Sequence, residues 1–334
     1  MNLLPHSNGL YKLKKEKINV MNIIKKIVIG IFCLIAAGFI IQQTVDILDS
    51  TKMKSRFKYV RIDGKRIEYK LDGRGQYTVV FDGDIGKTMF QWDSVLKEIN
   101  NQGDVRTFVY NRQGYGFNDG GSTKSPKDAA EDLKSVLKKA GVTGKLILVG
   151  DKYGSLIVTN FAKEFPDSVS GVVLIDPIDE EIMKQDDYKK SIRGKYYRSE
   201  IEEIGSNFLL TTLMQKMGLT LENIQFKQTL SQSKLEEFSI LENKSNYKQA
   251  VFNEYYNLYN GNSDSQDEDL LKDKQLYIIT KDEGDSIKRI GDEDNTKFYK
   301  YDDKEDIFEV KDSNIIVNAI NSVINKIIKS EKTN

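Results

Sequence analysis

The chain has 334 residues, 39% of them hydrophobic and 30% charged, so it is long and apolar enough to bury a sizeable core. Its 50 basic and 50 acidic residues cancel, but residues 1–45 hold six lysines against one glutamate, and the mildly acidic remainder argues against nucleic acid as the main partner. Cys33 and His6 are the single cysteine and the single histidine, which excludes an intrachain disulfide and a multi-cysteine metal site.

The first element in chain order is an uncharged stretch at residues 27–45. A helix of this length reaches about 28 Å, close to the hydrocarbon thickness of a bilayer, and predicts a transmembrane helix. By the positive-inside rule the lysine-rich residues 1–26 form a cytoplasmic tail, and the chain after Asp46 lies outside. A cleaved signal peptide is the alternative, although residues 39–43 lack the small side chains of a cleavage site. The sequence therefore predicts a single-pass protein of the cell membrane, with a linker at 46–56.

Strand and helix patterns alternate from residue 57 onward. A hairpin is expected over 57–71, turning at Asp63-Gly64. Apolar strands are expected at 77–81, 105–110, 146–150 and 171–175. Amphipathic helices are expected at 89–100, 126–139 and 153–164. This alternation predicts one α/β domain over 57–334, with a mostly parallel sheet covered by helices on both faces.

A long helical insertion follows the strand at 171–175. The next strand is expected only at 275–280, far more chain than a simple connection needs. Helices are expected in between at 195–217, 233–241 and 247–259. An inserted cap at about 179–273 explains them better than a second domain, because a last strand at 296–301 and a closing helix at 313–329 complete the sheet pattern. Five cap tyrosines are expected to fill its interior, with lining a pocket as the alternative: Tyr196, Tyr197, Tyr255, Tyr256 and Tyr259.

The stretch from Leu146 to Ser155 organises the predicted domain. An apolar strand ends in Gly150-Asp151-Lys152-Tyr153-Gly154, and a helical pattern follows at once. Strand, tight turn and helix are the context of the nucleophile elbow, whose motif is Gly-x-Ser-x-Gly. Both glycines are present, but Lys152 holds the position of the nucleophile.

From residue 57 onward the chain resembles the α/β-hydrolase family, and specifically its lid-bearing, membrane-anchored group. Besides the elbow, Tyr110–Asp119 resembles the family loop Tyr-Asp-Arg-x-Gly-x-Gly-x-Ser-Asp, and Val172–Pro177 resembles the strand that precedes the cap. Leu213–Leu219 is similar to a cap segment of membrane-anchored members. The resemblance implies an α/β-hydrolase fold with a helical cap.

The resemblance also places the family's catalytic positions on this chain. The serine position is Lys152, the acid falls at Asp282 or Asp285, and the histidine position is Asp306. No shift of register restores a histidine, because His6 lies upstream of the predicted membrane helix.

The oxyanion-loop positions implied by the resemblance are Gly83, Asp84 and Tyr153. A carboxylate at Asp84 opposes the developing negative charge that such a loop stabilises, unless its side chain points to solvent.

These replacements predict a non-catalytic protein that binds an unknown small molecule or protein in the cleft beneath the cap, around Lys152, Tyr153, Asp84 and Asp306. The alternative is an enzyme, either a hydrolase of ester or peptide bonds or one that uses the Lys152 amine as a nucleophile. Surrounding carboxylates hold a lysine charged and disfavour that role. Ser155 is expected to be a small packing residue rather than a displaced nucleophile. The sequence shows no cofactor fingerprint and no metal-ligand spacing.

Lys152 and Asp306 replace two groups that meet in the family and carry opposite charges. They are therefore expected to form an ion pair, which Asp282 or Asp285 joins.

Overall fold

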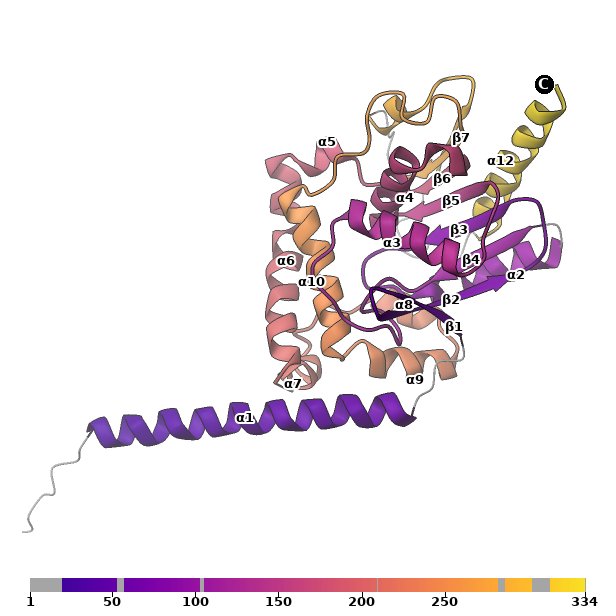
Figure 1. The fold of residues 1–334 in the computed structure, drawn as a ribbon. Coiled ribbons are helices and arrows are strands. Elements are labelled where there is room, and N and C mark those ends of the chain that lie inside the picture. The colour runs from indigo at the N-terminus through magenta and orange to yellow at the C-terminus, as the bar shows by residue number, and fades with distance from the viewer. Residues whose placement is uncertain are drawn as a thin grey trace, which may run out of the picture.

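The computed structural model describes residues 20–52, 57–102, 105–208, 210–281, 286–301 and 313–333. Figure 1 shows a long N-terminal helix, α1 (Val20–Lys52), and a body of sheet and helices beside its C-terminal half. The expectations for Asp282, Asp285 and Asp306 fall outside the described residues, and so does His6.

The described strands form one sheet in the order β1-β2-β4-β3-β5-β6-β7-β8. β1 (Lys58–Ile62) and β2 (Lys65–Asp72) are an antiparallel hairpin, β2 is antiparallel to β4, and all other neighbours are parallel. The remaining strands are β3 (Thr78–Asp82), β4 (Arg106–Tyr110), β5 (Leu146–Asp151), β6 (Val169–Ile175), β7 (Gln275–Thr280) and β8 (Thr296–Lys300). The mostly parallel sheet is therefore confirmed, close to the predicted strand bounds.

Helices cover both faces of this sheet. α3 (Pro126–Lys139) and α4 (Tyr153–Glu164) contact each other on one face, while α2 (Asp93–Gln102) and α12 (Ser313–Thr333) contact each other on the other (Figure 1). Short 3-10 turns are found at Met89–Trp92, Pro166–Ser168 and Ile287–Ile290. The amphipathic pattern predicts an inner face of Ala129, Leu133, Val136 and Leu137 for α3. The last three are buried, whereas Ala129 is only partly buried and Ala130 is buried beside it.

The chain between β6 and β7 forms the expected helical cap. Its helices are α5 (Glu180–Met183), α6 (Asp186–Ser206), α7 (Leu210–Lys216), α8 (Ile224–Thr229), α9 (Gln232–Leu241) and α10 (Ser245–Asn260). The expected helix at 195–217 is wrong at its start and in its continuity, because α6 begins at Asp186 and ends at Ser206. The buried side of α6 is largely small or polar, with Ser199, Glu202, Gly205 and Ser206, so no apolar period marked its bounds.

α1 is a single 33-residue helix that is exposed along most of its length. Within the described ranges one helical stretch, Val20–Gln42 with 23 residues, is long and apolar enough to cross a membrane, and it fits a signal anchor or a signal peptide. The helix continues to Lys52, so the expected linker is helical over 46–52. That stretch contains no glycine or proline to end a helix.

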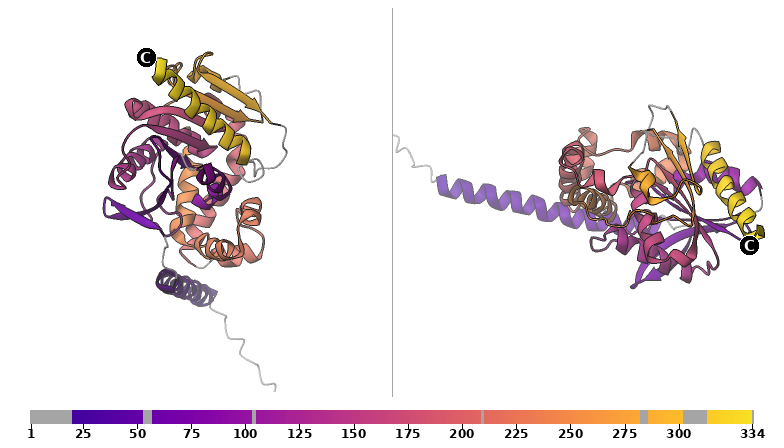
Figure 2. Two further views of the ribbon diagram at one scale, coloured as in Figure 1. Left: turned by 90° about the vertical axis from the view of Figure 1, so that its right-hand side faces the viewer. Right: turned by 90° about the horizontal axis from the view of Figure 1, so that it is seen from above.

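Figure 2 shows the same arrangement from two further sides. In the right-hand view α1 projects away from the body, and in the left-hand view it is seen nearly end-on below the body. In both views α12 lies against the sheet. The cap lies on the side of the body that is closer to the free part of α1 (Figure 1).

Candidate functional site

The turn between β5 and α4 has the geometry of a nucleophile elbow. Lys152 at its tip has φ 46° and ψ −107°, a strained conformation for a non-glycine residue. Its N–H donates to Ile175 O at 2.9 Å, and its carbonyl accepts from Ser155 N at 2.9 Å. A Cβ on Gly154 would lie 2.3 Å from Asp82 O, so only glycine fits there. The turn therefore has the strained tip and the close backbone approach of the predicted elbow, with Lys152 at the tip.

A buried polar cluster lies directly beneath this turn. The Asp151 carboxylate accepts from Gln91 Nε2 at 2.7 Å and lies 3.5 Å from Lys87 Nζ. The Lys87 and Asp151 side chains are only 6% and 2% exposed. The Asp151 carboxylate thus interacts with Gln91 and Lys87 below the elbow. Removing the charge of Lys87 or of Asp151 would leave the remaining charge poorly compensated in the interior.

The glycine-rich loop after β3 has three consecutive amides with partners inside the protein. Asp84 N donates to Gln91 Oε1 at 3.2 Å, Ile85 N to Asp84 Oδ1 at 2.7 Å, and Gly86 N to the Tyr115 hydroxyl at 2.9 Å. An oxyanion hole works through donors that are aimed at the substrate. Here the Asp84 carboxylate accepts a hydrogen bond from the next amide, Ile85 N, so this donor is not aimed at a substrate.

Arg112 connects this loop to the cap. Its guanidinium donates to Gly83 O at 2.7 Å and Asp84 O at 3.1 Å, and it pairs with the Asp82 carboxylate. The same guanidinium also donates to both carboxylate oxygens of Glu254 on cap helix α10, at 2.7 and 3.0 Å. Burial raises the pKa of Glu254, and Arg112 opposes that rise. One buried cation therefore holds the loop and the cap together.

A cavity of about 720 Å³ separates the cap from the C-terminal ends of the central strands. Asp84, Lys87 and Lys152 line it from the sheet side. The cap adds an aromatic and apolar wall that includes Tyr188, Ile192, Phe226, Val251 and Tyr255. Burial raises the pKa of Tyr188 and of Tyr255, and the Asp84 carboxylate raises both further. Asp84 is therefore close to the aromatic wall.

The residues expected at the site do not all reach this cavity. Lys152 and Asp84 line it, and Lys152 is half-buried. Tyr153 is not among its lining residues. Its side chain is 2% exposed, its hydroxyl accepts from Asn257 Nδ2 at 3.0 Å, and its ring lies 5.4 Å from the Arg112 guanidinium carbon. The side chain thus supports the Arg112 cluster, whereas its backbone follows Lys152 in the elbow.

Ser155 is fully buried and engaged with the backbone. Its hydroxyl donates to Lys152 O at 2.5 Å and accepts from Ile178 N at 3.0 Å. This is the packing role that the sequence predicted.

The expectation that the cap tyrosines fill the cap interior is wrong for Tyr197 and Tyr256, which are 50% and 37% exposed. Tyr196 and Tyr259 are half-buried and stack on each other with ring centroids 4.5 Å apart, while Tyr255 lines the cavity.

Several site residues had no predicted role. No sequence motif marks Lys87, Gln91 or Glu254, and Arg112 is marked only as part of the family-like loop Tyr110–Asp119. Arg112 is the one sequence feature that could indicate this cluster, because an arginine that is buried requires acidic partners. The sequence does not show that one of them comes from α10, 142 positions away.

Comparisons with known proteins agree with this geometry. The model of a family described as alpha/beta hydrolase fold matches residues 84–298. Similar solved structures include the epoxide hydrolase VrEH1 from Vigna radiata (TM-score 0.61, 15% identity, 81% of this chain and 98% of that chain). A thermophilic esterase from Thermogutta terrifontis (TM-score 0.57, 16%, 82% and 99%) and the epoxide hydrolase CorEH (TM-score 0.62, 12%, 81% and 98%) are also similar. At these identities the likeness concerns the fold alone.

A protein of Bacillus subtilis (strain 168), "Uncharacterized protein YqjL", is 28% identical over 106 residues, which is 31% of this chain. The match spans 41% of that protein's length. The family model covers more than half of the present chain and includes the elbow and most of the cap-bearing region. The chain therefore belongs to the α/β-hydrolase fold family.

Proposed function

We propose that this chain is a membrane-anchored, extracytoplasmic and non-catalytic α/β-hydrolase-fold protein that binds a small molecule or a protein in the cavity beneath its cap. The observation that carries the proposal is the strained turn with Lys152 at its tip. A hydrolase of this family needs a hydroxyl nucleophile there and a histidine base. The full sequence contains a single histidine, His6, which precedes the apolar helix in the sequence.

The oxyanion loop supports the same conclusion. Stabilising a tetrahedral intermediate needs donors about 2.7–3.1 Å from the developing oxyanion. Asp84 N and Ile85 N already donate within the protein, and the Asp84 carboxylate lines the cavity. A negative charge developing at this position would be repelled rather than stabilised.

The cavity supports a binding role. Small-molecule sites commonly enclose roughly 300–1,000 Å³, and the volume here lies within that range. Its sheet side carries charged groups, including Lys152, and its cap side combines an aromatic and apolar wall with the charged residues Lys195, Glu202, Glu222 and Lys248. This lining suits a small molecule with a polar group that faces Lys152 and an apolar part that lies against Phe226 and Val251.

The exposed apolar helix supports anchoring outside the cytoplasm. Val20–Gln42 is long enough to span a bilayer, and lysines gather on its N-terminal side. The body then lies on the opposite side of the membrane from residue 1.

A second candidate function is an enzyme that uses Lys152. The strained backbone and the adjoining cavity favour it, because an amine held there could condense with a carbonyl compound and release water. Asp84 lines the same cavity, and a carboxylate near an amine disfavours the neutral form that this chemistry needs. Borohydride trapping of a carbonyl compound at Lys152 would support the second candidate.

Binding can be tested with 8-anilinonaphthalene-1-sulfonate, an aromatic dye with one anionic group. Purified full-length protein should enhance its fluorescence saturably. Val251→Trp fills the cavity wall and should abolish the saturable component, and Lys152→Met should weaken it. Ile240→Trp, at a partly exposed position of α9, is the matched control and should leave it unchanged. Equal dye binding by both tryptophan variants would show that the cavity is not the binding site.

A further inference from the structure

The outward side of α6 carries a distinctive set of side chains. Between residues 190 and 204 its exposed positions are basic, apolar or small, and none is acidic. Apart from Lys195, which lines the cavity beneath the cap, these positions are Lys190, Ser191, Arg193, Gly194, Tyr197, Arg198, Ile201 and Ile204. We call these positions the α6 outer face. Tyr197, Ile201 and Ile204 are 50%, 56% and 55% exposed. Soluble surfaces rarely present apolar side chains as a continuous helical stripe, so this face indicates a partner.

The C-terminal end of α6 is in contact with α1. Phe208 follows α6, and its ring centroid lies 6.3 Å from that of Phe39. A Cβ on Gly38 would lie 2.7 Å from Phe208 O, so glycine permits this close approach. Gln42, one turn further along α1, is buried. α6 therefore ends against the last turns of the apolar span Val20–Gln42.

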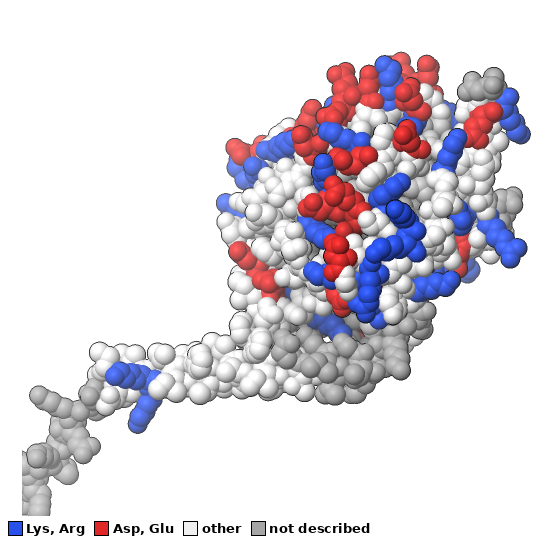
Figure 3. Space-filling view, viewed as in Figure 1, with Lys and Arg blue, Asp and Glu red and all other residues white. Residues whose placement is uncertain are grey.

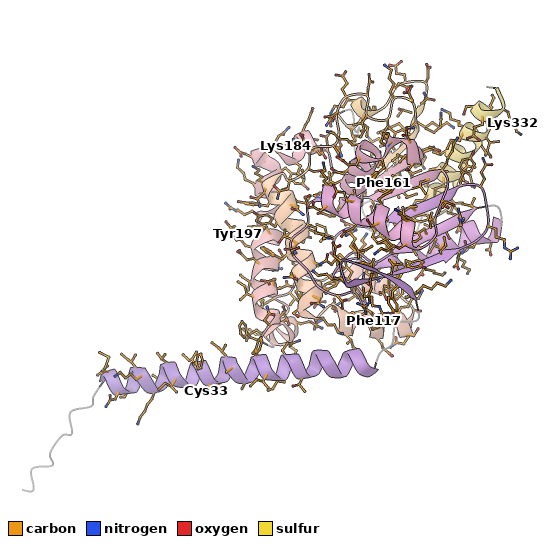
Figure 4. The ribbon with its side chains drawn as sticks, viewed as in Figure 1. Cys33, Phe117, Phe161, Lys184, Tyr197 and Lys332 are labelled. Atoms are coloured by element: carbon orange, nitrogen blue, oxygen red, sulfur yellow. The ribbon has the colours of Figure 1, made fainter. Side chains whose placement is uncertain are left out.

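This contact fixes the depth of α6 when α1 crosses a bilayer. Gly38 precedes Gln42 by four residues, or about 6 Å along a helix, so Phe208 reaches the boundary between hydrocarbon and headgroups. α6 runs crosswise to α1 (Figure 1), and thus along the membrane surface. Tyr197 lies on the side of the cap toward which the free part of α1 extends (Figure 4).

We propose that the α6 outer face rests on the outer surface of the membrane that α1 crosses. The inference rests on the proposed anchoring through α1, and it adds a second attachment made by the cap. Tyr197, Ile201 and Ile204 enter the interface, where aromatic and aliphatic side chains leave water favourably. Arg193 and Arg198 reach anionic lipid headgroups.

The charge distribution agrees with this occupant. Figure 3 shows a mostly uncharged surface where the cap meets α1. Asp187, near the start of α6, pairs with Lys190 at 3.0 Å. Glu200 and Glu203 lie beside the stripe and are half-buried. Burial raises the pKa of Glu203, and the negative charge of Glu200 raises it further. An anionic surface therefore meets basic groups on the α6 outer face.

The test uses the full chain with Cys33→Ser, which removes its single cysteine. Ile201→Cys places an environment-sensitive fluorophore on the α6 outer face, and Lys332→Cys places it on α12, far across the body (Figure 4). Both proteins are reconstituted in vesicles of phosphatidylcholine and phosphatidylglycerol that carry doxyl-labelled lipid in both leaflets. We expect the vesicles to carry the protein on flotation, and the Ile201 label to be quenched several-fold more strongly than the Lys332 label.

A charge variant separates docking from anchoring. Arg193→Glu with Arg198→Glu should lower quenching at Ile201→Cys toward the Lys332→Cys value, while flotation through α1 is unchanged. Flotation with equal quenching of the two labels would overturn the α6 docking and leave the anchoring standing. Failure to float would overturn both. If the fluorescence of the Ile201 label changes with protein concentration but is not quenched by the doxyl lipid, the α6 outer face contacts a second copy of the chain. That result would also overturn the proposal.

Discussion

The Arg112 guanidinium donates to the Glu254 carboxylate at 2.7 and 3.0 Å and thereby ties the loop after β4 to cap helix α10. The two side chains are only 9% and 10% exposed. Because Arg112 also donates to Gly83 O and Asp84 O, the position of the cap and the shape of the glycine-rich loop after β3 depend on the same cation. The cavity that Lys152 lines lies between the sheet and the cap, the two parts of the molecule that this cation connects.

Glu254→Ala should lower the free energy of unfolding by about 3–5 kcal/mol, because it leaves a buried guanidinium with reduced compensation. Chemical denaturation monitored by circular dichroism measures this change. Asp187→Ala, which breaks the exposed pair with Lys190, is the control and should have little effect. A Glu254→Ala change no larger than the control would contradict the role assigned to the Arg112 pair.

Lys152→Ser alone should not create an esterase. The new hydroxyl would lack a histidine to accept its proton, and the amides of Asp84 and Ile85 would still be engaged. Hydrolysis of a p-nitrophenyl ester should require Asp306→His as well, and adding Asp84→Gly should raise the rate further by freeing Ile85 N. Strong turnover by the single Lys152→Ser variant would show that another base operates near the elbow.

Lys152 and Asp306 remain a predicted ion pair, since Asp306 lies outside the described residues. Asp306→Ala should lower the melting temperature clearly, by an amount that corresponds to about 3–5 kcal/mol for a deeply buried pair. Lys152→Met combined with Asp306→Leu should recover much of the loss, because it removes both charges together. If the double variant is as unstable as Asp306→Ala, the two side chains do not compensate each other.

The start of the cap should be sensitive to acid through Asp179. Its carboxylate accepts from Glu181 N at 2.8 Å and pairs with Arg289 at 2.7 Å. Burial alone would raise the pKa of Asp179, but hydrogen bonds from Arg289, Ser286 and Glu181 N outweigh it and lower the pKa. A lowered folded-state pKa contributes stability that is present above the unfolded value of about 3.9 and is lost as the pH falls through the folded value.

Asp179→Asn should therefore weaken the fall in melting temperature below about pH 4 and lower the melting temperature at neutral pH. Melting temperatures measured across the acid range provide the comparison. An unchanged acid dependence would mean that Asp179 has the same pKa in the folded and unfolded chain.

Much of the fold was predictable because local signals agreed with each other. Ser125 caps α3 in a capping box with Asp128, and the predicted range 126–139 is the observed one. Gly150 and Gly154 marked the elbow because backbone approaches there leave no room for a side chain. The start of α6 was missed because its buried positions are mostly small or polar, so periodicity gave no signal.

The site was less predictable, since its groups come from distant parts of the chain. Lys152 and Asp84 could be placed because each occupies a motif position. The partners of Asp151 and Arg112 could not, because pairing Lys87 with Asp151 and Glu254 with Arg112 depends on how the sheet edge and the cap meet. The side chain of Tyr153 shows the same limit: its backbone position followed from the motif, but its direction did not.

The central claim is a hydrolase fold without hydrolysis, and a fluorophosphonate serine-hydrolase probe combined with a panel of acyl esters tests it most directly. Purified full-length protein should show no labelling and no turnover above the Lys152→Ala variant. Turnover that disappears in Lys152→Ala would establish catalysis at the elbow. Labelling or turnover that survives Lys152→Ala would place an active site elsewhere, and either result would contradict the account.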